Sequence, residues 1–370
     1  MSDVDTVIVG AGVVGLACAA RLARAGRSVI VLERNDRVGQ ETSSRHSGVI
    51  HAGLYYPAGS LKALTCVEGR RALYERCERL ALPHAKLGKL LVAADAEEAA
   101  RLETIRARGV ENGAGALRML GRADVAAMEP RVRAVAGLWS RETGIVDAHA
   151  LMDSYVAEAR EHGAELALVT NVEGLSRERG GWRVHTRRAD GDAFSVAADH
   201  VVNAAGLASD RVAELAGVDV DALGYRLHPC KGDYFVLSPR LRGIASHLIY
   251  PVPVHAGLGV HITMDLGGKV TAGPDTEYVD RVRYDVDPAK AARFGQALRR
   301  FLPEVRDDDL RPDYAGVRPK LQGPGEPFAD FVIEEASANG APGLVNLIGI
   351  ESPGLTASAA IADRVLALLS

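Results

Sequence analysis

The chain has 370 residues, of which 47% are hydrophobic, 25% charged and 5% aromatic, and its formal net charge is −4. This is the composition of a globular protein of about two domains, and the absence of a basic block argues against a nucleic-acid partner. The four cysteines lack metal-ligand or C-x-x-C spacing, so we predict a reducing compartment and no metal site. No apolar run approaches the ~18–20 residues of a transmembrane helix.

The N-terminal segment predicts a βαβ unit. A β-branched run at 7–10 and an apolar run at 29–32 read as buried strands, with a helix over 16–25 between them. The apolar stretch 6–20 also has features of a signal peptide. Because the leading residues 1–5 are acidic rather than basic, we interpret the stretch as a strand and a helix.

The turn between the first strand and the helix carries a dinucleotide-binding fingerprint. Gly10 permits a tight turn, Gly12 lets the backbone approach a pyrophosphate, and Gly15 lets the helix pack on the strand. The pyrophosphate is expected at the helix N-terminus, where free N–H groups face it. Glu33, directly after the second strand, is positioned to accept a hydrogen bond from a ribose hydroxyl.

Further along, the pattern predicts a helix over 61–80, a strand over 87–93, and a helix over 148–162 for which Asp147 is the N-cap. An antiparallel meander that closes on a further strand is expected from the alternating segments 166–175, 182–187, 193–196 and 200–204.

The last third of the chain contains short strand-like runs broken by Gly and Pro between 226 and about 320, with one helix over 289–302. A strand over 344–348, a glycine turn and a helix from 355 to the end complete the pattern.

The polar loop 34–48 is long enough to wrap a cofactor larger than NAD, so FAD is favoured and an NAD(P) dehydrogenase is the weaker alternative. With the segments 201–206 and 349–356, this loop resembles the D-amino-acid-oxidase-type family of FAD-dependent oxidoreductases. Within that family, the L-2-hydroxyglutarate dehydrogenase/oxidase branch is the most similar, on the segments 45–57, 228–235 and 258–261.

The resemblance implies an α/β fold with a Rossmann-like FAD-binding domain of the glutathione-reductase type and an α+β substrate domain built on a mixed or antiparallel sheet. The FAD-binding domain is expected to be discontinuous, at 1–82, 146–222 and 338–370. The substrate domain is expected at 83–145 and 223–337.

The resemblance also implies which residues bind FAD. The N-terminus of the last helix is expected to direct its amides at the flavin, where the helix dipole would stabilise negative charge on the reduced ring. The cofactor-binding residues are expected to be Gly10, Gly12, Val14, Gly15, Glu33, Arg34, Thr42, Ser43, Ser44, His46, Ser47, Gly48, Val49, Val172, Ala204, Ala205, Gly206, Arg318, Gly354, Leu355 and Thr356. Some relatives attach flavin covalently at a position similar to His46, which is an alternative here.

The candidate catalytic residues suit the oxidation of a small acid. His51 and His261 are candidate bases for a hydroxyl proton, because imidazole titrates near neutrality. Arg318 can bind a carboxylate through two parallel hydrogen bonds, and Lys231 could add a second positive charge. Tyr250 could bond a substrate oxygen, although a tyrosine that only packs explains it equally well.

We therefore predict FAD-dependent oxidation of a small 2-hydroxy acid, similar to L-2-hydroxyglutarate, by hydride transfer to flavin. An amine or amino-acid oxidase acting on glycine or sarcosine is the enzymatic alternative, and a flavin-binding redox sensor without turnover is the non-enzymatic one. The electron acceptor can be oxygen, a quinone or a partner flavoprotein. A cytoplasmic location is expected, with peripheral association with the inner membrane as an alternative.

Overall fold

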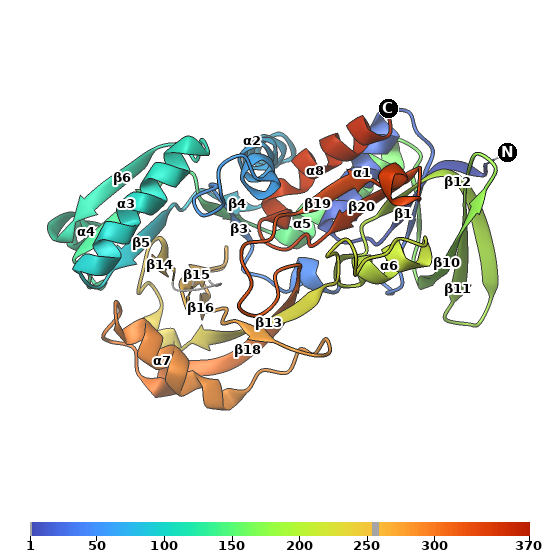
Figure 1. Cartoon of the computed structure of the whole chain (residues 1–370). Helices are drawn as coiled ribbons and strands as arrows, with labels where there is room; N and C mark the ends of the chain where they lie inside the picture. The colour runs from blue at the N-terminus through green and yellow to red at the C-terminus, as the bar shows by residue number, and fades with distance from the viewer. Residues whose placement is uncertain (1, 254–258) are drawn as a thin grey trace.

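A computed structural model describes residues 2–253 and 259–370, so Leu258 of the segment 258–261 lies outside the described residues. Two large sheets dominate the fold (Figure 1). The first sheet has eight strands, which are β1 (Val4–Val9), β2 (Val29–Leu32), β9 (Glu165–Ala167), β10 (Thr170–Glu178), β11 (Gly181–Arg188), β12 (Ala193–Asn203), β19 (Val332–Glu335) and β20 (Leu344–Ile348).

The core of the first sheet is parallel, with β1 between β12 and β2 and with β20 on the far side of β12. The helices α1 (Val13–Arg24), α5 (Ala148–Glu161) and α8 (Gly354–Leu368) pack together over this sheet. The side chain of Asp147 caps α5 as predicted, by accepting hydrogen bonds from the amides of His149 and Ala150. The other face is covered in part by α6 (Ser209–Leu215).

The meander differs from the prediction in two places. The expected strand over 166–175 is two strands, because Val169 adopts φ +54° and separates β9, which pairs parallel with β2, from β10. The expected strands over 193–196 and 200–204 are one strand, β12. It pairs with β11 near its start and with β1 near its end.

The second sheet has nine strands, and it carries α3 (Ala96–Glu111), α4 (Arg122–Met128) and α7 (Ala291–Arg299). Its strands are β5 (Lys89–Ala93), β6 (Leu117–Gly121), β7 (Ala136–Ser140), β13 (His228–Leu237), β14 (Leu248–Pro251), β15 (Ile262–Met264), β16 (Val270–Ala272), β17 (Glu277–Tyr278) and β18 (Leu310–Lys320).

Between the two sheets lie α2 (Leu61–Leu80), which has the predicted bounds, and a small sheet of β3 (Val49–Ile50), β4 (His84–Ala85) and β8 (Gly144–Val146). We propose that the two domains follow the two large sheets. The expected boundary at 337/338 is then too late, because β19 pairs with β20 in the first sheet, with Val332 opposite Ile348. Within the described residues, no helix combines the length and apolar composition needed to cross a bilayer.

Candidate active site

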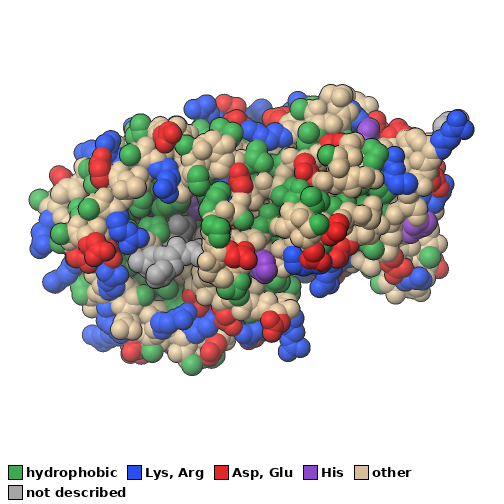
Figure 2. Space-filling model, viewed as in Figure 1, with side chains coloured by type: hydrophobic (Ala, Val, Ile, Leu, Met, Phe, Trp, Pro, Cys, Tyr) green, Lys and Arg blue, Asp and Glu red, His purple; other side chains and the backbone are tan. Residues whose placement is uncertain are grey.

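A cavity of about 670 Å³ lies between the two large sheets. In the space-filling view, the surface is hollowed between the part that carries α3 and the part that carries α7 (Figure 2). Most of the predicted site residues line this cavity, namely Gly12, Val14, Thr42, Ser43, His46, Ser47, Val49, His51, Ala204, Gly206, Tyr250, His261, Arg318, Gly354 and Leu355.

The glycine turn forms a cradle at one end of the cavity. A Cβ on Gly10 would lie 2.6 Å from the carbonyl oxygen of Ala204, and Gly10 also adopts φ +104°. A Cβ on Gly12 would lie 2.9 Å from Oγ of Ser43, which accepts a hydrogen bond from the amide of Val13 at 3.0 Å. Two helix N-termini, those of α1 and α8, border the cavity without a side-chain cap. This arrangement fits the pyrophosphate and ring of FAD.

Glu33 and Arg34 take different positions beside this cradle. The buried Glu33 carboxylate accepts hydrogen bonds from the amides of Ala11 at 2.8 Å and Asn35 at 2.9 Å, so it is anchored next to the glycine turn. Arg34 forms an ion pair with Glu41, at 2.5 Å, and does not line the cavity.

Other predicted cofactor residues shape the cavity from behind it. Thr356 is fully buried, accepts the amide hydrogen bond of His51 at 3.0 Å, and bonds the carbonyl of Val49 at 3.3 Å, so it ties α8 to β3. Val172, on β10, is partly buried and packs against the apolar cluster of the first sheet. The remaining residues of this kind do not line the cavity: they are Gly10, Gly48 and Ala205 in irregular backbone, Gly15 in α1 and Ser44 at the end of a short 3-10 helix.

Arg318 reaches the cavity from β18, opposite Cys230 on β13. Its Nη2 donates to the carbonyl of Asp275 at 3.0 Å, and its Nη1 lies 3.5 Å from Sγ of Cys230. A Cβ on Gly232 would lie 2.6 Å from Nη2, so this glycine leaves room for the guanidinium. The guanidinium is thus held in place with donors left for a carboxylate.

The prediction that Lys231 adds positive charge to the site is wrong. Side chains alternate along a strand, so Gly232 and Tyr234 line the cavity whereas Lys231 and Asp233 lie on the other face of β13. Nζ of Lys231 forms an ion pair with Oδ1 of Asp233 at 2.5 Å, and both side chains are fully buried.

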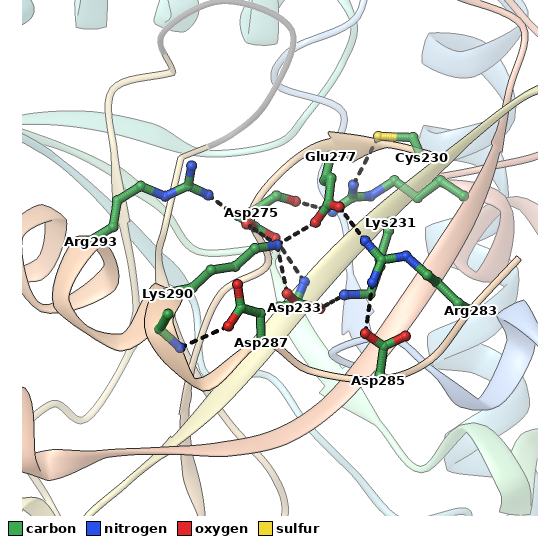
Figure 3. Close-up of polar contacts among 12 residues, drawn as sticks. Cys230, Lys231, Asp233, Asp275, Glu277, Arg283, Asp285, Asp287, Lys290 and Arg293 are labelled. Atoms are coloured by element: carbon green, nitrogen blue, oxygen red, sulfur yellow. Dashed lines mark hydrogen bonds and ion pairs between the residues drawn. The ribbon is translucent and has the colours of Figure 1, made fainter. Parts of the chain in front are cut away.

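The ion cluster on that other face supports Arg318 indirectly. Figure 3 shows Lys290 extending toward Asp233, Asp275 and Glu277, with Nζ–O distances of 2.6, 3.0 and 2.5 Å. The Asp275 side chain also accepts the amide hydrogen bond of Asp233 at 2.8 Å. These contacts fix Asp275, whose carbonyl accepts the hydrogen bond from Arg318.

His261 is buried in the cavity wall and stacks on Tyr250, with ring centroids 3.7 Å apart. Its Nδ1 lies 2.8 Å from the carbonyl oxygen of Gly259. A carbonyl can only accept, so we assign the proton to Nδ1 and a free lone pair to Nε2. Burial, with the nearby Lys89 and Arg318 cations, lowers the pKa of His261 to about 3.

His51 is the second imidazole of the cavity. Its Nε2 lies 3.2 Å from Oγ of Ser352, a residue that sequence reasoning missed. Burial, followed by the charges of Lys89 and His261, holds the pKa of His51 well below its usual value. Both imidazoles are therefore neutral at pH 7 and able to accept a proton.

A buried ionic triad in the cavity wall was also missed. The carboxylate of Glu351 binds Nζ of Lys320 at 2.8 and 2.9 Å and Nζ of Lys62 at 3.0 Å, and all three residues line the cavity. Lys320 follows Arg318 by two positions, so strand alternation could have placed it on the cavity face. Neither the partner Glu351 nor the approach of α2 has a local signal.

His46 lines the cavity and is held in one orientation, because its Nδ1 accepts the amide hydrogen bond of Gly48 at 3.0 Å. Burial lowers the pKa of its imidazole to about 4. Covalent attachment of flavin at this residue stays a prediction.

Residues 5–368 of the chain match the family described as DAO, FAD dependent oxidoreductase. The chain belongs to this family. It is 40% identical to "L-2-hydroxyglutarate dehydrogenase, mitochondrial" of Arabidopsis thaliana, over 98% of this chain and 82% of that protein. The human protein of the same name is 31% identical over 98% of this chain and 88% of that protein.

Solved structures of FAD-dependent oxidoreductases share the fold. L-α-glycerophosphate oxidase from Mycoplasma pneumoniae, solved with FAD bound, has a TM-score of 0.89 at 26% identity and covers 100% of this chain and 95% of that chain. Glycine oxidase from Geobacillus kaustophilus has a similar fold, with a TM-score of 0.82 at 20% identity. The match covers 100% of this chain and 95% of that chain. The predicted family, α/β fold, enzyme class and FAD cofactor are confirmed, so the NAD(P) and non-catalytic alternatives are set aside.

Proposed function

We propose that this FAD-dependent oxidoreductase oxidises L-2-hydroxyglutarate, or a close polar analogue, to the 2-oxo acid. The observation that carries the proposal is that Arg318 and two neutral imidazoles, His51 and His261, line one cavity. Relatives named L-2-hydroxyglutarate dehydrogenase support it, because they match nearly the whole chain.

Each residue has a defined role in this proposal. Arg318 binds the carboxylate next to the reacting carbon, and the stacked ring of His261 directs its Nε2 lone pair at the substrate hydroxyl and accepts that proton. His51, paired with Ser352, orients the same hydroxyl. Bound FAD would supply the acceptor for the hydride that leaves the α-carbon. Residues of both sheets line the cavity in which these groups meet.

Anaerobic reduction of the flavin, followed by its absorbance, tests this proposal. The panel contains both enantiomers of 2-hydroxyglutarate, lactate, glycerol 3-phosphate, glycine and sarcosine. We expect L-2-hydroxyglutarate to bleach the flavin at the lowest concentration and the highest rate. Bleaching by glycine or sarcosine, with no reaction from any hydroxy acid, would establish the amine oxidase alternative instead.

The electron acceptor is the second part of the proposal. We propose that reduced flavin passes its electrons to a quinone or a partner flavoprotein at the cytoplasmic face of the inner membrane, and to oxygen only slowly. The relatives are named dehydrogenases, which supports an acceptor other than oxygen. Reoxidation rates with air, a short-chain quinone and an artificial dye separate these routes.

A further inference from the structure

Lys89, at the start of β5, is a buried cation beside the cavity. Its side chain is 1% exposed. Its Nζ lies 4.1 Å from the ring centroid of Tyr250 and 5.2 Å from that of Tyr55, and both tyrosines line the cavity. In the described parts of the chain, no carboxylate comes within 4 Å of this ammonium.

The other buried lysines differ from Lys89 in this respect. Lys62 and Lys320 share the carboxylate of Glu351, and Lys231 pairs with Asp233. An ammonium taken out of water without an anion carries a penalty of several kcal/mol, so a buried lysine of this kind is expected to meet an anionic ligand.

A second group beside Lys89 also lacks a partner. The hydroxyl of Tyr55 is buried and has no hydrogen-bond partner among the residues that the structure describes. Burial raises the pKa of this phenol above its ordinary value, so it stays protonated and can donate a hydrogen bond. A free hydroxyl donor on a cavity-lining residue and a buried ammonium behind its ring therefore lie close together, a combination that suits a carboxylate.

The Tyr250 ring links Lys89 to the proposed base, His261. His261 stacks on the Tyr250 ring that also contacts Lys89, and the charges that act on His261 are those of Lys89 and Arg318. Two cations, Lys89 and Arg318, thus act on the proposed base. Arg101 and Arg108 of α3 also line the cavity, where each donates to a backbone carbonyl, that of Pro253 or of Tyr55.

We propose that Lys89 and the Tyr55 hydroxyl form a second carboxylate subsite, so that the enzyme selects a dicarboxylate held by Arg318 at one end and by Lys89 at the other. This inference rests on the proposed oxidation of a 2-hydroxy acid. The carboxylate bonds the Tyr55 hydroxyl and is attracted by the ammonium beside that ring. Coulomb attraction is strong there because the Lys89 side chain is buried.

The test compares two substrates and two enzymes. L-2-hydroxyglutarate carries the distal carboxylate, and L-2-hydroxyvalerate has the same five carbons without it. Lys89→Met removes the charge and keeps the length of the side chain. We expect the variant to lose about 10- to 100-fold in kcat/KM for the dicarboxylate, mostly through KM, and to stay within about threefold for the monocarboxylate. Lys89→Arg is expected to restore part of the preference.

A binding measurement supplies a readout that does not depend on turnover. The oxidised holoenzyme is titrated with 2-oxoglutarate and with 2-oxovalerate, and the perturbation of the flavin spectrum gives each Kd. Lys89→Met is expected to weaken only 2-oxoglutarate. Tyr55→Phe, which removes a single hydroxyl, is expected to weaken the binding of 2-oxoglutarate to a smaller extent. This variant tests the subsite if Lys89→Met does not fold.

Lys86→Met is the matched control, because Lys86 lies three residues away, is half exposed and pairs with Glu142. It should leave the preference between the two acids unchanged. Equal losses for both acids in Lys89→Met and Tyr55→Phe would overturn the subsite while leaving the proposed function intact. If neither hydroxy acid reduces the flavin of the unmodified enzyme, the proposed function itself fails.

Discussion

At the scale of single residues, the Tyr250 ring brings two basic groups together without direct contact. Lys89 and His261 both pack against it, and each lacks a carboxylate to stabilise added charge in the described part of the chain. Burial lowers the pKa of Lys89 to about 7 and that of His261 to about 3. Both groups therefore hold a proton less readily than they would in water, and the imidazole holds it less readily than the amine.

This order predicts the acid limb of the rate of flavin reduction. Lowered pKa values keep His51 and His261 unprotonated as the pH falls, so the limb should lie well below pH 6.5. The groups that act on His261 are Lys89 from β5 and Arg318 from β18. Removing the cation in Lys89→Met raises the pKa of the imidazole and should move the limb to higher pH. Stopped-flow measurement of flavin reduction between pH 5 and 9 gives the position of the acid limb in the unmodified enzyme and in Lys89→Met. An acid limb that does not move in the variant would contradict an effect of Lys89 on His261.

At the scale of elements, the pairing of β13 with β18 determines which side chains face the cavity. Gly232 and Gly316 stand opposite each other in this pair, and β18 passes against the loop 34–48 that follows β2. A Cβ on Gly316 would overlap the carbonyl oxygen of Arg45 in that loop. The close approach sets the position of Arg318, two residues further along the strand.

Gly316→Ala is therefore expected to displace β18 from the loop and move the guanidinium of Arg318. We expect kcat/KM to fall at least about 10-fold, mainly through a higher KM, because a shift of about 1 Å is enough for such losses. Steady-state kinetics and the fraction of flavin retained on gel filtration measure this. Gly217→Ala is the control, since its Cβ meets nothing within 4 Å and only its φ of +83° is strained. An equal effect in the control would point to general destabilisation.

At the scale of the whole molecule, Glu351 joins three distant segments. It lies in the turn between β20 and α8, Lys62 belongs to α2, and Lys320 ends β18 in the second sheet. The two lysines hold the pKa of the Glu351 carboxyl below its ordinary value despite the opposing effect of burial. The triad thus connects the two large sheets at the cavity wall.

Glu351→Gln leaves two buried ammonium groups without their anion, so we expect a loss of about 3–5 kcal/mol in the free energy of unfolding. Urea unfolding of the holoenzyme at pH 7 measures it. The contribution of a carboxyl with a lowered folded-state pKa is present above its unfolded pKa and disappears as the pH falls through the folded value. The difference between the two proteins should therefore shrink in acid. A loss below about 1 kcal/mol at pH 7 would show that the triad does not hold the sheets together.

The sequence by itself determined the features that depend on local spacing. The glycine turn at Gly10, Gly12 and Gly15, the α2 bounds and the Asp147 cap are set by residues within a few positions of one another, because φ preferences and helix capping act over one turn of chain. The loop 34–48 and the segments 201–206 and 349–356 carried the resemblance that predicted the family and its cofactor, now confirmed.

Only the tertiary structure decided which ionisable side chains meet. Lys62 and Glu351 are 289 residues apart in the sequence. Lys89 becomes a candidate for binding a carboxylate only because the pairing of β14 with β5 brings Tyr250 beside it. Lys231 was misplaced because a strand has two faces, and the sequence around it does not say which one a cavity will occupy. Charge pairing depends on distance and on the exclusion of water, and both are set by contacts between segments far apart in the chain.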